Sequence, residues 1–515
     1  MQTYHYNPLE NNEIRLLTLH AGNQESRVRC TLRHAQLPPE VQSSASLPHN
    51  KGLVSGFSVD KDESRAEAMY DAVSYCWGNQ NDRVTISLDG SDFDVGRNLE
   101  SALHHLRLSS IDRILWIDAI CINQCDIKER GQQVLRMGKI YERALAVRVW
   151  LGPEEARSDE AMRWMADSPK GSLFETGTDM SNPEKIVDGP SSTSFRRLRR
   201  RIPSVESTSV DGFTSNARMI GALCQLMCRP WFSRRWVIQE IAFASQAVVH
   251  CGYMSVYWWQ FAEAIRSLPR IWKHQAELYG ASWITCTQPR TSFGGQISTD
   301  SSGYWGDPEA QSAARLLFAS ENVFGGIMDG SGSQTTRLYG LQTLVEEFAS
   351  FDVSDPCDTI YALLPLAKDS HSWNPSYSQN VMEVYQYFIS YSVEVSGSLD
   401  ILLRPWARSY RDLPSWVAVN HGPKFATAVG RSLRQHAELF IGSPQSRIYN
   451  ASGDLKPRIN FPEFPKSRIR QLQATGILLD TVAEERGPAT AGSLIKDWPS
   501  WALEAAQRKG TDVAT

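Results

Sequence analysis

Residues 115–152 read LWIDAICINQCDIKERGQQVLRMGKIYERALAVRVWLG, and this stretch decides the fold. The apolar run from Ile114 to Ile117, which Ile120 and Ile122 extend, is typical of a strand covered on both faces. Past a polar turn, apolar residues recur at the spacing of one helix face, at Val134, Met137, Tyr141 and Ala144. A second apolar run, 146–151, ends at Gly152. The pattern predicts a strand–helix–strand unit with a right-handed crossover.

Polar residues gather where the first predicted strand gives way to the helix. They are Asp118, Asn123, Gln124, Asp126, Glu129 and Arg130. Ligands bind at the carboxyl ends of strands in an open α/β sheet. We therefore expect a candidate site at this edge.

The flanking sequence extends the α/β prediction over about residues 1–260. Alternating runs at 14–19 and 27–32 predict an N-terminal hairpin, and Asp89-Gly90 predicts the turn of a second hairpin. Residues 70–77 and 247–251 are further strand candidates, and Asn98 is a candidate helix cap. We expect a mostly parallel sheet flanked by helices.

The rest of the chain is expected to be organised differently. Apolar spacing predicts a mainly helical region over 261–440, with helices near 341–348, 358–367 and 381–395. Residues 441–515 are polar and proline-rich, and a mobile insert is expected at about 167–216.

Bulk composition narrows the class of protein. The chain has 515 residues and a formal net charge of -4, which argues against a nucleic-acid-binding surface over the whole protein. No apolar run is long enough to span a membrane, and the N-terminus lacks the features of a secretory signal. Nine cysteines are sparse for this length and fit a reducing compartment. We expect a cytoplasmic protein. The basic run 196–201 leaves a nuclear location as the alternative, although a solvated loop is the favoured interpretation of this run.

Three blocks of sequence resemble the fungal heterokaryon-incompatibility (HET) domain. The block at 70–78, YDAVSYCWG, resembles the opening motif of that domain, and 115–152 resembles its central motif. The block at 229–240, RPWFSRRWVIQE, resembles its closing motif. Residues 355–363 and 413–417 resemble the downstream part of long HET-domain proteins. Such proteins usually continue past the point at which this chain stops, which implies a short or truncated member.

The resemblance implies a function in non-self recognition in a filamentous fungus. Proteins with this domain trigger growth arrest or cell death when unlike cells fuse. The expected partners are a second copy of the chain or another incompatibility protein. The family is also remotely similar to Toll/interleukin-1 receptor-like domains, some of which cleave NAD with a glutamate. NAD is therefore a possible substrate, by analogy of fold alone.

Three carboxylates are the candidate catalytic residues. Glu129 would be the acid in an NAD-cleaving reaction, with Glu240 second, stabilising oxocarbenium character as nicotinamide leaves. For Glu129 the simpler alternative is a capping box, because it lies three residues after Asp126. Asp118 is either a site residue or a buried carboxylate held by loop amides or an arginine.

Further polar and aromatic residues of the three blocks are candidates for ligand binding. They are Trp77, Asn123, Gln124, Arg130, Arg234, Trp236 and Gln239. The tryptophans are equally explained as core residues, and the arginines as partners of a carboxylate. The pairs Cys121/Cys125 and Cys224/Cys228 lack a familiar zinc-ligand pattern, so we expect no metal.

Three functions remain open. The chain is a signalling module without catalysis, an enzyme that cleaves NAD or binds a nucleotide, or a regulator of a stress or secondary-metabolite pathway. Convergence of Asp118, Glu129 and Glu240 on one open cleft would favour the enzyme. Burial of each in its own interactions would favour the module.

Overall fold

The computed structural model describes five main ranges of the chain. They are 4–37, 69–167, 210–279, 312–327 and 334–420, apart from positions 11, 24–25, 156, 323, 371–372, 409 and 411–412, together with short pieces between 442 and 474. Most of the expected insert, including the basic run 196–201, lies outside these residues. Its last part, 210–216, belongs to a helix instead.

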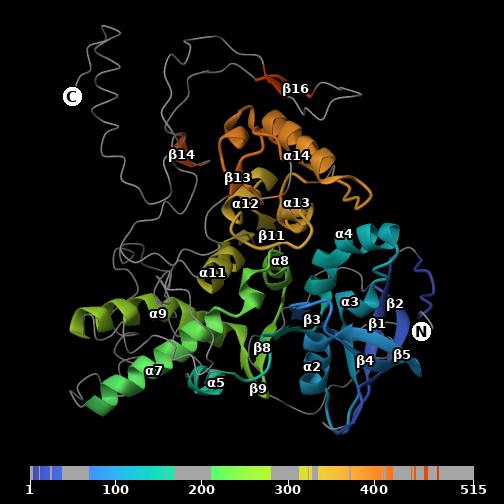
Figure 1. Ribbon diagram of the computed structural model, residues 1–515, viewed down its shortest axis with the longest axis vertical. Helices are drawn as coiled ribbons and strands as arrows, with labels where there is room; N and C mark the ends of the chain where they lie inside the picture. Colours follow the sequence, from blue (N-terminus) through green and yellow to red (C-terminus); the bar gives the residue numbers. More distant parts are fainter. Residues whose placement is uncertain are drawn as a thin grey trace.

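A nine-stranded sheet forms the centre of the first half, in the order β5-β4-β2-β1-β6-β3-β7-β8-β9. Its four middle strands are parallel: β6 (Arg113–Trp116), β3 (Asp71–Tyr75), β7 (Val147–Trp150) and β8 (Ala247–Cys251). β3 is buried along its whole length, Asp71 and Ser74 included, as expected for a strand that is covered on both faces. Helices lie on both sides of the sheet (Figure 1).

Antiparallel strands complete the sheet at both ends. β1 (Glu13–Leu19) and β2 (Arg29–Gln36) form the predicted N-terminal hairpin, and β9 (Met254–Tyr257) pairs with β8 at the far edge. β4 (Arg83–Leu88) and β5 (Ser91–Gly96) turn at Asp89 and Gly90, whose φ angles of 49° and 79° suit a tight hairpin turn. The α/β class is confirmed, with the parallel pairing concentrated in the middle of the sheet.

The unit at the centre of the sequence is β6, α3 (Asp118–Cys121), α4 (Ile127–Arg143) and β7. β3 lies between the two parallel strands, so the crossover passes over one strand. The expected extension of β6 to Ile122 is wrong, because α3 makes a helical turn that still buries Ile120.

Other helices flank the sheet. They are α2 (Arg97–Leu106), α5 (Ser158–Ala166), α7 (Val210–Met227), the 3-10 turn η2 (Pro230–Ser233), α8 (Trp236–Ala242) and α9 (Trp258–Tyr279). Asn98 lies inside α2 and does not cap it, because Gly96 occupies the cap position. The turn that begins at Pro230 ends at Ser233, and α8 begins only at Trp236.

The second half contributes α11 (Ser312–Asn322), α12 (Leu341–Glu347), α13 (Asp358–Tyr361), η4 (Leu364–Leu366), α14 (Val381–Ser396) and η5 (Asp400–Leu402). The mainly helical character of this part fits the prediction. Short two-stranded pairings accompany it: β10 (Phe324–Ile327) with β11 (Gln334–Arg337), β12 (Ala407–Arg408) with β13 (Val419–Asn420), β14 (Gly442–Ser443) with β15 (Ser446–Arg447), and β16 (Ile459–Asn460) with β17 (Gln473–Ala474). None of the described helices is both long and apolar enough to cross a membrane.

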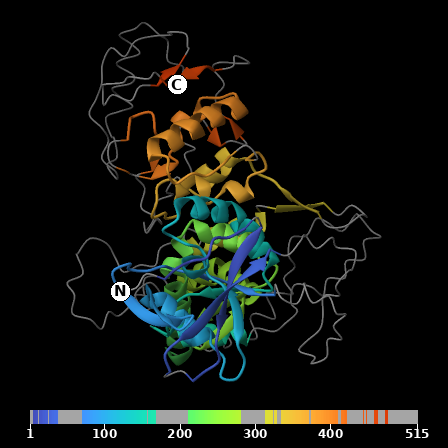
Figure 2. The same ribbon diagram turned by 90° about the vertical axis from the view of Figure 1, so that its right-hand side faces the viewer.

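The second half packs directly on α4 and α8. In Figure 2, α12 to α14 (yellow to orange) lie directly above α4 (teal). A Cβ atom on Gly131 would lie 3.2 Å from the Pro375 carbonyl oxygen, and one on Gly138 would lie 3.0 Å from Pro365 Cβ and 2.9 Å from the Phe243 ring. Buried apolar residues continue without a break from the sheet into this region. The boundary expected near residue 260 stays a prediction.

Replacing Gly138 with leucine should therefore destabilise the protein by about 1–3 kcal/mol, because the side chain has to enter a filled space between α8 and η4. Urea unfolding of the full chain measures the effect. Lys139→Leu, at the next and exposed position of the same helix, is the control and should change stability by less than about 0.5 kcal/mol. Equal effects of the two substitutions would contradict the close packing.

Candidate functional site

The carboxyl ends of β3 and β6 meet where the sequence predicts a site. Trp77, just after β3, donates its indole N–H to Asp118 Oδ2 at 2.8 Å, and Asp118 lies just after β6. Arg234 reaches the same edge and donates to the carbonyl oxygen of Tyr75. Gln124 donates to the backbone oxygen of Asp118 at 2.8 Å. Four predicted site residues are thus brought together.

Asp118 is held by hydrogen bonds on both oxygens. The backbone N–H of Ala119 donates to Oδ1 at 2.8 Å, and the Tyr75 hydroxyl also bonds this carboxyl group. Burial raises the pKa of Asp118, and the charge of Arg234 acts against that rise. Burial likewise opposes the charge of Arg234, but Glu240, Cys76 and Asp118 outweigh it and raise the pKa of this guanidinium. These charges act on one another electrostatically, and Asp118 and Arg234 are partly exposed.

Glu240 lies deeper, against the middle of β3. Ser74 donates its hydroxyl to Glu240 Oε2 and accepts the indole N–H of Trp231 at 2.7 Å. Glu240 is 2% exposed, and burial raises its pKa to about 7, with Arg234 acting in the opposite direction. This chain of hydrogen bonds ties η2 and α8 to the sheet.

Glu129 is separate from both groups. Arg15 of β1 binds it through two bonds, Nη1 to Oε1 at 2.6 Å and Nη2 to Oε2 at 3.0 Å. The backbone N–H of Asn123 donates to the same carboxylate at 2.7 Å. Asp126 caps α4 as predicted, accepting from the N–H groups of residues 128 and 129. The reciprocal half of the capping box is wrong, because Glu129 bonds Asn123 and Arg15 instead of the cap residue.

The remaining candidates contact other parts of the chain. Arg130 lies 3.5 Å from the centre of the Tyr377 ring and 3.4 Å from Asp355 Oδ2. Trp236 donates to Asp358 Oδ2 at 3.0 Å. Asn123 Oδ1 accepts the N–H of Cys125 at 3.2 Å, in the turn before α4.

Gln239 is fully buried, and its amide atoms make no hydrogen bond to protein.

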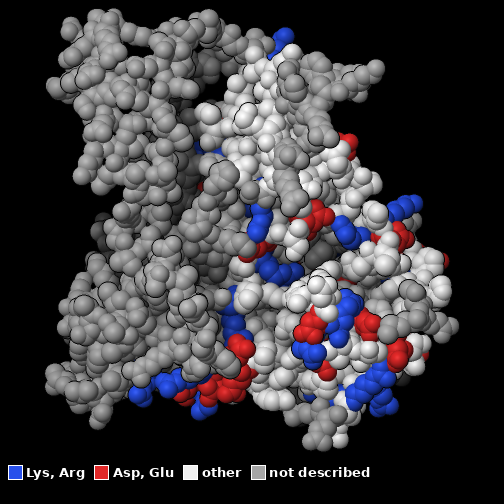
Figure 3. All heavy atoms as spheres, viewed as in Figure 1, with Lys and Arg blue, Asp and Glu red and all other residues white. Residues whose placement is uncertain are grey.

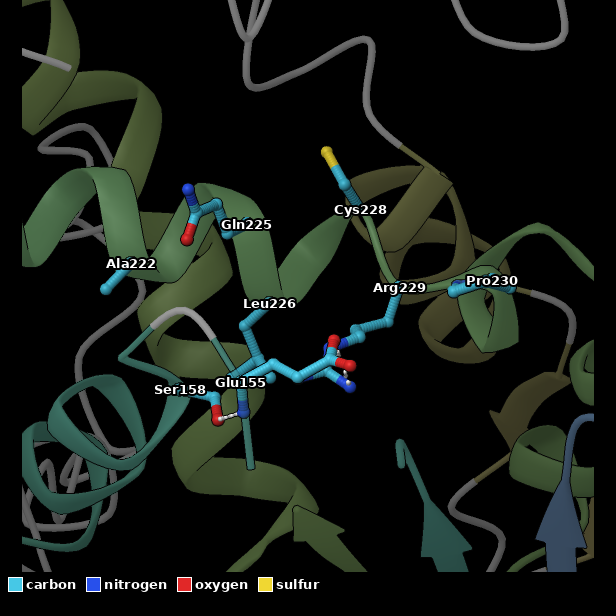
Figure 4. Close-up of a pocket in the computed structure, with 8 residues that line it drawn as sticks. All are labelled: Glu155, Ser158, Ala222, Gln225, Leu226, Cys228, Arg229 and Pro230. Atoms are coloured by element: carbon cyan, nitrogen blue, oxygen red, sulfur yellow. Dashed lines mark hydrogen bonds and ion pairs between the residues drawn. The ribbon is translucent and has the colours of Figure 1, made fainter. Parts of the chain in front are cut away.

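The three candidate carboxylates are held by different partners among the described residues. Two pockets stand out in the described part of the chain, and neither contains any of them. One, of about 210 Å³, lies beside the carboxyl end of β7, with Arg229 3.6 Å from Glu155 (Figure 4). Its lining residues are Glu155, Ser158, Ala222, Gln225, Leu226, Cys228, Arg229 and Pro230. The catalytic and ligand-binding roles of the candidates stay predictions.

Sequence reasoning missed Arg15, Ser74 and Arg235. Arg235 is 1% exposed and donates to the carbonyl oxygens of Thr359 and, at 2.5 Å, of Phe348. Burial lowers its pKa to about 10. An arginine within the apolar run IRLLTL was the one available signal for Arg15, since a buried guanidinium requires a carboxylate or carbonyl oxygens.

Five of the eight described cysteines are buried. Cys30, Cys121, Cys224, Cys251 and Cys357 are buried, whereas Cys125 and Cys228 are exposed. Burial raises the pKa of Cys121 to about 12, which keeps its thiol protonated. Within the described ranges, no group of three or more His, Cys, Asp or Glu side chains is arranged to hold a metal ion.

Loss of either partner of the Arg15–Glu129 pair should cost about 3–5 kcal/mol, because the other charge is left buried and unpaired. We expect this for Glu129→Gln and Arg15→Met in urea unfolding. The double variant should lose less stability than the two single variants lose together. Asp82→Asn, which breaks the exposed ion pair with Arg97, is the control and should cost less than about 1 kcal/mol. Strict additivity would contradict a coupled pair.

Glu240 should make stability depend on pH near neutrality. Its pKa in the folded chain, about 7, lies above the ordinary value of 4.5, so the folded state binds more protons between these limits. The stabilisation that Glu240 contributes is fully present below about pH 4.5 and is lost as the pH rises through 7. Relative to Glu240→Gln, the free energy of unfolding of the parent should rise by up to about 1.4 kcal/mol for each unit that the pH falls between about pH 7 and 5. A pH-independent difference would contradict the raised pKa.

Comparison with known proteins finds a similarity over the part of the chain that holds these contacts. The sequence model of the heterokaryon incompatibility protein (HET) family matches residues 70–240, the range that holds the three packed blocks. Heterokaryon incompatibility protein 6, OR allele, from Neurospora crassa is 32% identical over 208 residues, which is 36% of this chain and 29% of that protein. The match thus covers under a third of the relative, and no solved structure matches. Residues 70–240 of this chain are therefore similar to the HET family, and the similarity extends over about a third of the chain.

Proposed function

We propose that this chain acts in heterokaryon incompatibility as a signalling and interaction module whose activation arrests growth or kills the cell. The HET match over residues 70–240 and the similarity to an incompatibility protein of Neurospora crassa support this function. The observation that carries the non-catalytic form of the proposal is the separate burial of Glu129 and Glu240. Each is engaged by an internal partner, Arg15 and Ser74 respectively, and neither lines either of the two pockets described above.

An enzyme that cleaves NAD is the second candidate. The pKa of Glu240, about 7, suits a general acid near neutral pH, and it is the observation that favours this alternative. A catalytic acid also has to reach the bond that breaks. Glu240 is 2% exposed and bonded to Ser74, so the packed arrangement favours a structural carboxylate.

We expect induced expression of the full chain in a filamentous fungus to arrest growth without lowering cellular NAD. Glu240→Gln keeps the shape and the acceptor for Ser74, so it should arrest growth like the parent. Trp231→Ala removes a buried side chain that bonds Ser74 and should abolish arrest by loosening the domain. Protein levels, hyphal extension and NAD are measured in the same cultures.

The same cultures distinguish the alternatives. A fall in NAD with the parent that disappears in a folded Glu240→Gln variant would establish catalysis and overturn the module. Normal growth at high levels of folded parent would overturn the effector role. An altered metabolite profile during normal growth would favour the regulatory function.

A further inference from the structure

A second pocket lies at the opposite edge of the sheet from the candidate site. It has a volume of about 250 Å³ and is open to solvent. Its residues come from the starts of β3 and β6, from the residues before β7 and from the end of α2: Met69, Tyr70, Asp71, Leu108, Asp112, Arg113, Ile114 and Leu145. The pocket therefore marks the amino ends of the parallel strands.

Several exposed apolar side chains lie on the rim of this pocket. Met69 and Leu145 are each 51% exposed, and Leu108 is 40% exposed. Ile111, which adjoins the pocket residue Asp112, is 66% exposed. Scattered apolar residues are ordinary on a protein surface, but a group around one hollow marks an interaction site.

The pocket also holds the cation Arg113, on which the charge of Arg148 acts unfavourably and that of Asp71 favourably. Arg113 is partly buried, and no described residue forms a hydrogen bond or ion pair with its side chain. The acidic residues nearby are already engaged: Asp71 with Arg148 at 2.9 Å, and Asp112 with His20 at 2.9 Å. A half-buried guanidinium without a hydrogen-bonded partner is costly, so the site is complementary to a carboxylate carried beside apolar side chains.

The chain itself carries an exposed carboxylate beside apolar side chains, near the end of α14. Three of the exposed large apolar residues have an acidic neighbour in the sequence: Ile111, Ile127 and Val395. Asp112 is paired with His20, and Asp126 caps α4. Glu394, beside Val395 on the last turn of α14, is exposed and pairs with none of the described residues. Val395 is 57% exposed, and Leu403, just beyond η5, is 67% exposed.

These two surfaces lie far apart on one molecule. α14 belongs to the upper end in Figures 1 and 2, whereas α2, whose end borders the pocket, belongs to the lower end in Figure 1. One copy therefore cannot fill its own pocket with its own α14. Two different surfaces that fit each other form a head-to-tail contact, and such contacts extend into open chains unless the rotation closes a ring.

We propose that the pocket at the amino ends of β3 and β6 receives the end of α14 from a second copy of this chain, with Glu394 paired to Arg113. Val395 and Leu403 of the incoming copy then cover the apolar rim. Net charge does not oppose the contact, because acidic and basic side chains are interspersed among the described residues on the face in Figure 3. The inference rests on the proposed function, since a signalling module needs a means of assembly.

Charge-reversal variants of the purified full chain test the contact by sedimentation velocity over a wide range of concentration. The parent should associate, with a mean mass that keeps rising with concentration and falls at high salt. Arg113→Glu and Glu394→Arg should each weaken association about tenfold or more. Lys139→Glu, an equal charge change at an exposed position of α4, should leave it unchanged.

The decisive measurement is the association of a mixture of the two charge-reversal variants. Each retains one native surface that the other lacks, and the two reversed surfaces also match, so the mixture should associate although neither variant does so alone. A monomeric parent, association that survives both reversals, or a mixture that stays monomeric would each overturn the proposal. Should circular dichroism show that a reversal variant is unfolded, Leu145→Ser and Val395→Ser test the same contact through its apolar part.

Association is measured on purified protein and growth arrest in cells, so the two proposals fail separately. Association that is lost in Arg113→Glu while growth arrest persists would overturn assembly as the trigger and leave the effector role in place. Association without any growth arrest would overturn the proposed function and leave the contact established.

Discussion

The buried ion pair between Arg15 and Glu129 joins the N-terminal hairpin to the helix that follows β6. A charge that leaves water needs an opposite charge or several hydrogen bonds, and each partner here supplies that need for the other. Arg15 also donates to the carbonyl oxygens of Cys121 and Asn7, so the whole turn before α4 is held against β1. The position of α4 in turn decides where the second half of the chain can pack, through Gly131 and Gly138.

The same constraint explains the closing block of the HET domain. Three consecutive residues point to three different partners: Arg234 to the carbonyl of Tyr75 in the sheet, Arg235 to carbonyls of the second half, and Trp236 to Asp358. The segment cannot be a regular helix while meeting all three, which accounts for the break between η2 and α8. Polar residues at the carboxyl edge of the sheet thus have a structural explanation in the packing of the two halves.

The sequence predicted the elements whose pattern is local. The strand–helix–strand unit, the two hairpins and the cap at Asp126 each depend on residues close in the chain, and all are present. Arg15 and Glu129 are 114 residues apart, and Ser74 and Glu240 are 166 apart, so no periodicity reveals either contact. The capping-box prediction for Glu129 failed for this reason: a distant arginine and the N–H of Asn123 took the carboxylate that local spacing assigned to the cap.

The family match ends at residue 240, but the structural unit does not. β1 and β2 precede it, β8 and β9 follow it, and all four belong to the same sheet as the three HET blocks. Asp358 lies outside the match too, yet it accepts hydrogen bonds from Trp236 and from Tyr377, while Arg235 bonds the backbone on either side of it. Removing the second half would expose Arg235 and Trp236 and strip both of these partners. The HET blocks of this chain are therefore completed by segments before and after them, from β1 at one end to at least Tyr377 at the other.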